Sequence, residues 1–170
     1  MKEIEAVGAG SFFHIVKKYV SDRGAEAGIK PQYSLRFAFD KSGDTFDALK
    51  QAARELNVPL NSTNMRLSDG NLVQLRDGTQ PYQGLWLVDL NSRFPVPIVD
   101  VNAHDLKLDA EPGSGTKVRV AFRIGSSKKG DLVFFLTGVQ IIDLVEGVAP
   151  HKFGVYTQGT VDDDEGDGFQ

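Results

Sequence analysis

The chain has 170 residues, 41% of them hydrophobic and 25% charged, which is the balance of an ordinary globular protein of about one domain. It has no cysteine, which excludes disulfides, thiolate zinc sites and thiol catalysis and weakly favours a reducing compartment. No stretch approaches the roughly 18 apolar residues of a membrane span, and the start, MKEIEAVGAG, lacks the basic region of a signal peptide. We therefore expect a cytoplasmic protein that does not contact membranes.

The net charge of −4 is unevenly distributed along the chain. The last ten residues, VDDDEGDGFQ (161–170), hold five acids and no base. The other residues hold all 19 bases and 18 acids, so they are nearly neutral with a slight positive excess. A charge split of this kind indicates a polyelectrolyte partner, and a tail that only improves solubility is the alternative.

The first half of the chain predicts two strands and a helix. Residues 11–20 (SFFHIVKKYV) are aromatic and β-branched, and residues 32–40 (QYSLRFAFD) alternate between apolar and polar positions, as a half-buried strand does. Residues 44–57 predict a helix with Asp44 as its N-cap, an apolar stripe on one face, and Pro59 after its end.

The second half predicts further strands separated by glycine and proline. We expect strands or strand pieces at 71–78, 82–92, 96–102, 116–125 and 132–147. Residues 116–125 (TKVRVAFRIG) alternate, so Lys117, Arg119 and Arg123 share one face opposite an apolar face. The run 132–147 is too long for one flat strand, and Gly138 predicts a bulge or bend within it.

These elements predict a mainly β protein of five to seven strands with one helix inserted after the second strand. Many short strands with glycine at the bends are typical of a small barrel or a sandwich, and the pattern alone does not separate the two. We expect residues 1–147 to form the domain, 148–160 a linker, and 161–170 a disordered acidic tail.

The sequence gives little support for an enzyme. His14, His104 and His151 are far apart and have no metal-ligand spacing. The segment GSGTK (113–117) lacks the full phosphate-loop motif, and DVNAHD (100–105) reads better as an ordinary polar loop than as a cation site. We expect no catalytic residues, no metal and no cofactor.

Basic and aromatic residues on strands predict binding of a single-stranded nucleic acid. Such a ligand needs cations along its phosphates and flat rings under its unstacked bases. A β-surface supplies both, because alternate side chains stand on one face. The candidate binding residues are Lys17, Lys18, Tyr19, Arg36, Trp86, Arg93, Phe94, Lys117, Arg119, Arg123, Lys128 and Lys129.

Each of these candidates has a structural alternative. The basic row at Lys117, Arg119 and Arg123 is also what the solvated face of a half-buried sheet looks like. Trp86 fits a core position as well as a stacking position. The remaining phenylalanines of the strands, at 37, 39, 122, 134 and 135, are predicted to belong to the core.

The order of segments resembles phage single-stranded DNA-binding proteins with an OB fold (oligonucleotide/oligosaccharide-binding fold). The matching pieces are SFFHIVKKY, PQYSLRFAFDK followed by the helix FDALKQAARE, then LRDG, Y-x-G-x-W (82–86) running into VPIVD, and VFFLTGVQIIDLVEG. The resemblance covers roughly residues 10–147. It implies an OB-fold-like five-stranded barrel, with extra strands and one inserted helix.

The acidic end with a near-terminal aromatic is the second point of likeness. In such families a tail of this type docks replication enzymes, such as a DNA polymerase or helicase, and competes with DNA for the basic groove. The resemblance implies this role for Asp162, Asp163, Asp164, Glu165, Asp167 and Phe169.

The leading hypothesis is therefore a sequence-nonspecific single-stranded DNA-binding protein of phage replication, recombination or repair, acting in the host cytoplasm. The alternative is a structural or protein-interaction β-domain, such as a virion or scaffold component, that binds no nucleic acid. A homodimer stays open as a further assembly.

Overall fold

The computed structural model describes residues 2–147, and the predicted linker (148–160) and acidic tail (161–170) lie outside the described residues. The chain forms, in order, β1 (Lys2–Tyr19), α1 (Asp22–Glu26), β2 (Gln32–Asp40), α2 (Asp44–Glu55), β3 (Ser68–Asp69), the 3₁₀-helix η1 (Gly70–Leu72), β4 (Leu85–Ser92), β5 (Ile98–Val99), β6 (Thr116–Ser126) and β7 (Leu132–Asp143).

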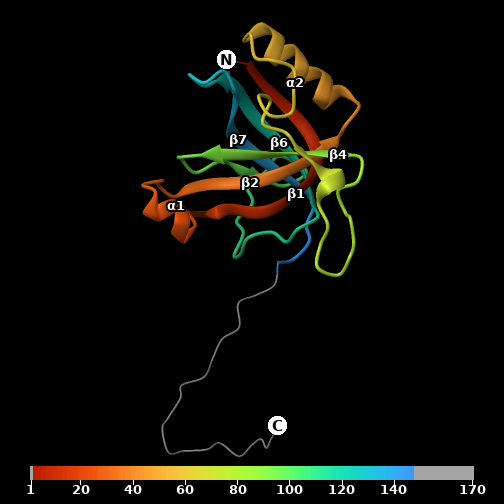
Figure 1. The fold of residues 1–170 in the computed structure, drawn as a ribbon. Coiled ribbons are helices and arrows are strands. Elements are labelled where there is room, and N and C mark those ends of the chain that lie inside the picture. Colours follow the sequence, from red (N-terminus) through yellow and green to blue (C-terminus); the bar gives the residue numbers. More distant parts are fainter. Residues whose placement is uncertain (1, 148–170) are drawn as a thin grey trace, which may run out of the picture.

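Five strands close into a barrel (Figure 1). β1 pairs antiparallel with β2 and with β6, while β2 pairs antiparallel with β4 and β6 with β7. The ring closes where β4 and β7 run parallel, at the pair Asn91 and Phe135. β3 and β5 pair with β4 and β7 outside the ring. A closed five-stranded barrel with one inserted three-turn helix is consistent with an OB fold, and the predicted fold class is confirmed.

The alternation of the strands places the core inside the barrel. On β6 the predicted apolar face is buried and the predicted basic face is exposed, as the period of two requires. β2 contributes Leu35, Phe37 and Phe39 to the same core. α2 covers one end of the barrel and buries Leu49 and Ala53. α1 lies on the opposite side of the barrel from α2 (Figure 1).

The long strand β1 pairs with two strands along its length: residues 2–10 lie beside β6, and residues from Ala9 onward lie beside β2. Gly8 lies so close to β2 that a Cβ atom there would come within 2.2 Å of the Ala38 carbonyl oxygen. A residue with a side chain therefore does not fit at this position without a backbone shift. Gly8 is thus required for the packing of β1 against β2.

Several sequence predictions for the elements were incomplete or wrong. Residues 71–78 form no strand, because η1 and turns take their place, and only Ile98–Val99 of the range 96–102 is a strand. Gly43 is the N-cap of α2 in place of Asp44, and α1 was not expected. The bulge predicted at Gly138 is confirmed, since Ala121 pairs with Gly138 and Phe122 pairs with Leu136. Within residues 2–147, no helix is both long and apolar enough to cross a membrane.

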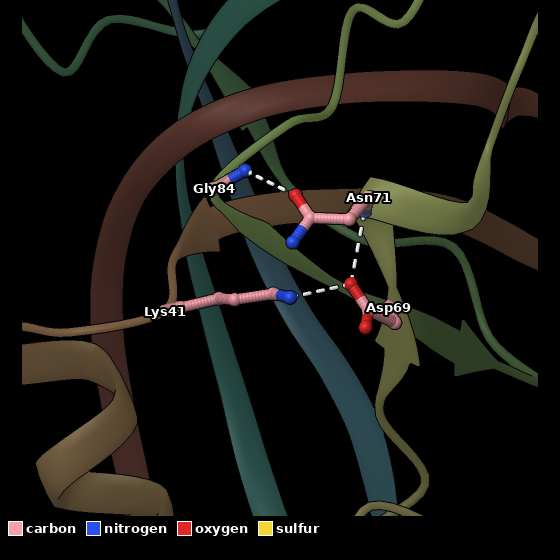
Figure 2. Close-up of polar contacts among 4 residues, drawn as sticks. All are labelled: Lys41, Asp69, Asn71 and Gly84. Atoms are coloured by element: carbon pink, nitrogen blue, oxygen red, sulfur yellow. Dashed lines mark hydrogen bonds and ion pairs between the residues drawn. The ribbon is translucent and has the colours of Figure 1, made fainter.

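A polar network fastens the segment between β3 and β4 to the end of β2 (Figure 2). The Lys41 ammonium pairs with Asp69, and the same carboxylate oxygen of Asp69 accepts the Asn71 N–H at 2.9 Å. The Asn71 side-chain oxygen then accepts the Gly84 N–H at 2.7 Å. The network fixes the point at which the chain enters β4. The hydrogen bonds from Lys41 and Asn71 hold the pKa of Asp69 below its ordinary value.

Candidate nucleic-acid interface

A groove of about 1080 Å³ crosses the outer face of β2, β4 and β7, where the barrel closes. Its lining includes Ser34 and Arg36 from β2, Asn91 from β4 and Thr137 from β7. Single-strand-binding OB folds use the same region, the face of their second and third strands. The groove thus lies over the strands that correspond to this region.

Four exposed aromatic side chains line this groove. Phe12 is 65% exposed, Tyr19 52%, Phe94 75% and Phe135 45%. An exposed aromatic side chain lacks the favourable free energy of burial. A cluster of four exposed rings in one groove is therefore typical of a binding surface. Tyr19 and Phe94 were predicted as binding residues. Phe12 was not, and the prediction that Phe135 belongs to the core is wrong.

Phe12 points into the groove because β1 carries a bulge. Ser11 pairs with Arg36 and His14 pairs with Ser34, so one extra residue of β1 stands between the two pairs. Phe12 has a φ of +49°, the left-handed region that a bulky residue rarely adopts. A β-bulge re-aims one side chain while its neighbours keep their faces, and Phe13 is buried here.

Local contacts order two of the other aromatic residues of the groove, Tyr19 and Phe94. The rings of His14 and Tyr19 stack at 4.2 Å with an angle of 10° between their planes. After β4, the hydroxyl of Ser92 donates to the Phe94 carbonyl at 2.7 Å and accepts the Phe94 N–H at 3.1 Å. The Tyr19 ring is therefore held by stacking, whereas the contacts at Phe94 order its backbone.

Four arginines supply positive charge to the groove: Arg36, Arg66, Arg93 and Arg123. Among the described residues that line it, Asp89 is the one acid. Arg36 pairs with Asp89 at 3.0 Å, Arg66 with Asp131 at 3.7 Å and Arg123 with Glu3 at 3.6 Å. Arg66 was not among the predicted residues. Cations beside exposed rings are the two elements that a single strand requires.

The remaining predicted cations lie outside the groove lining. Lys17 and Lys18 are exposed at the end of β1, and Lys128 and Lys129 are exposed in the turn between β6 and β7. Lys117 and Arg119 stand on the outer face of β6, where Lys117 is opposite Asp143 and Arg119 shares a shallow pocket with Glu5. The binding roles of these six residues stay predictions.

Trp86 lies on the inner side of β4, away from the groove lining. It is partly buried, packs against the core, and its ring is 6.0 Å from the ring of Phe46 on α2. The Lys41 ammonium lies 4.7 Å from the centre of the Trp86 ring. This placement is that of a core residue and gives no support to base stacking by Trp86.

Solved structures similar to this chain include single-stranded DNA-binding proteins of bacteriophages. The protein of bacteriophage Enc34 in complex with single-stranded DNA matches with a TM-score of 0.62 and 18% identity over 89% of both chains. The protein gp2.5 of bacteriophage T7 matches with a TM-score of 0.54 and 14% identity, over 95% of this chain and 98% of that one. At these identities the likeness establishes a shared fold.

The sequence itself matches no protein-family model and no curated protein. The structural neighbours are therefore the comparison that connects this fold with single-stranded DNA.

Proposed function

We propose that this protein binds single-stranded DNA without sequence preference, along the groove over β2, β4 and β7. The observation that carries the proposal is that four exposed aromatic side chains and four arginines line one groove. Each stacked base contributes about 1–3 kcal/mol, and every base has a face to stack, so the binding tolerates any sequence. The phage proteins of the same fold support the choice of DNA as the ligand.

The test is a titration of a fluorescently labelled oligo-dT, followed by anisotropy, with a duplex of equal length as competitor. We expect tight binding that unlabelled oligo-dT reverses and the duplex does not, because paired bases offer no free faces. Equal competition by the duplex, or no binding of oligo-dT, would contradict the proposal. The second result would favour a structural or protein-interaction domain.

We further propose that the acidic tail competes with DNA for the groove. Contacts connect the end of the described chain with the groove. The Val145 carbonyl accepts the Gly113 N–H at 2.7 Å. Glu111, two residues before Gly113, accepts the Lys17 N–H at 2.9 Å, and Lys17 is two residues before the groove residue Tyr19. From there, residues 148–170 span up to roughly 75 Å when extended. The tether gives the tail a high effective concentration at the groove.

The role of the tail is tested by deleting residues 161–170. We expect higher affinity for oligo-dT at low salt and a smaller gain at high salt, because salt screens the tail. Unchanged or weaker binding at every salt concentration would contradict the competition. A matched variant that replaces the five tail carboxylates by amides keeps the length and isolates the charge.

A displaced tail is free to bind other proteins. We propose that Phe169 and the carboxylates around it recruit replication proteins, such as a polymerase or helicase, in DNA replication, recombination or repair in the host cytoplasm. Phe169→Ala, compared with the intact protein in pull-down of the host replication proteins, tests this part. Equal recovery of these proteins by both would contradict it.

A further inference from the structure

Arg36 and Asp89 form an ion pair within the lining of the groove. The two residues face each other across β2 and β4. The Arg36 Nε donates to Asp89 Oδ1 at 3.0 Å, and its Nη2 donates to Asp89 Oδ2 at 3.5 Å. This fork is the geometry in which arginine binds a carboxylate or a phosphate. The side chains are 35% and 61% exposed, so a ligand has access to both.

Arg36 makes a second contact, with its face. The central carbon of its guanidinium lies 5.4 Å from the centre of the Phe12 ring. The guanidinium thus has an anion at its edge and a ring at its face. A bound single strand offers an arginine the same two partners, a phosphate and a base.

Asp89 is anomalous in a groove for a polyanion. It is the one acid among the described lining residues, and it lies directly opposite Arg36 in the pairing of β2 with β4. Its hydrogen bonds raise the pKa of Arg36 above the ordinary value. The pair does not bury either residue, so its contribution to folding is small. The position of Asp89 is better explained by the ligand than by stability.

We propose that Asp89 substitutes for a DNA phosphate in the empty groove, holding Arg36 until the phosphate of a bound strand displaces it. The inference rests on the proposed function and adds a regulation of the same site. Because the DNA phosphate only replaces Asp89 as the partner of Arg36, the number of ion pairs at Arg36 does not change. The contact between Arg36 and DNA therefore adds little to the binding free energy. After the exchange, the Asp89 carboxylate stays in the groove and repels the strand. Asp89 therefore lowers the affinity and speeds release.

The test is a double-mutant cycle of Asp89→Asn and Arg36→Gln, measured as affinity for labelled oligo-dT at low salt. We expect Asp89→Asn to bind about two- to fivefold more tightly than the wild type, the range for an exposed ion pair. In the Arg36→Gln background the same change gives a clearly smaller gain, because it relieves only the repulsion by the carboxylate, and the residue for which the two anions compete is absent. The salt slope of Asp89→Asn becomes steeper by about 0.7, for one more phosphate fully neutralised.

The matched control is Asp47→Asn, which removes the same charge from an exposed ion pair on α2, away from the groove. We expect it to leave the affinity unchanged, and thermal unfolding checks that all variants are folded. Weaker or unchanged binding by Asp89→Asn overturns the inference. An equal gain in both backgrounds also overturns it, because Asp89 then acts by general repulsion. If the wild type does not bind oligo-dT at all, the proposed function fails with it.

Discussion

Glu111 and Val16 are 95 positions apart in the sequence, and the Val16 N–H donates to both carboxylate oxygens of Glu111, at 3.0 and 3.2 Å. The same carboxylate accepts the N–H groups of Ile15 and Lys17, at 2.7 and 2.9 Å. The pairing of β1 with β6 ends at Gly10, so β1 has no strand on this side. One side chain thus supplies the acceptors that a strand would otherwise give.

We expect Glu111→Gln to lower the free energy of unfolding by about 1–3 kcal/mol, because a neutral amide accepts fewer and weaker hydrogen bonds from these three donors. Chemical denaturation measures the loss. Glu26→Gln, at an exposed position in α1, is the control and leaves stability unchanged. Equal stability of the two variants would show that the Glu111 contacts contribute nothing.

Two substitutions at Phe12 are expected to have the same effect on DNA affinity but different effects on stability. We expect Phe12→Gly and Phe12→Ala to weaken oligo-dT binding equally, by about 1–3 kcal/mol, because both remove the ring. Glycine fits the φ of +49°, so Phe12→Gly should be the more stable of the two by up to about 1 kcal/mol. Anisotropy and denaturation measure the two effects. An alanine variant as stable as the glycine variant would argue against strain at this bulge.

Phe135 and Trp86 give opposite expectations. Phe135→Ala removes an exposed groove ring and should weaken binding by about 1–3 kcal/mol with little change in stability. Trp86→Leu leaves a cavity against Phe46 and should lower stability while the affinity stays the same. Oligo-dT titration with thermal unfolding separates the two. Loss of affinity in folded Trp86→Leu would restore Trp86 as a stacking residue.

The pair of Lys41 and Asp69 predicts a pH dependence of stability. Because the pKa of Asp69 is lowered in the folded state, its contribution is fully present above the unfolded pKa of about 3.9. That contribution is lost as the pH falls through the folded pKa. We expect Asp69→Asn to be less stable than the wild type at pH 7, with the difference disappearing in strong acid. A difference that stays constant from pH 7 to pH 2 would contradict the assignment.

Much of the barrel could be predicted from the sequence because its strands alternate. The faces of β2 and β6 follow from a period of two, and the end of α2 follows from Pro59. The prediction of a strand at 71–78 was wrong because the apolar residues of this range are not buried. Leu72 is 82% exposed, and η1 and turns satisfy the backbone hydrogen bonds there. The composition of a segment does not show whether its apolar residues are buried against other elements of the fold.

The groove could be predicted only in part, because it depends on closure of the barrel. Arg36 was found from its strand face, and Phe94 from its place at a strand end. Phe135 could have been found, since it follows the buried Phe134 and successive side chains of a strand point to opposite sides. Phe12 and Arg66 both have a positive φ, at a bulge and in a loop, and no periodicity indicates such positions.

The central claim is that single-stranded DNA lies in the groove over β2, β4 and β7. The most direct measurement is an NMR titration of the isotope-labelled protein with oligo-dT, following every backbone amide. We predict shift changes concentrated at Phe12, Tyr19, Arg36, Phe94 and Phe135, with little change in α2. Changes confined to the outer face of β6, around Lys117 and Arg119, would contradict the account and place the DNA on the other side of the barrel.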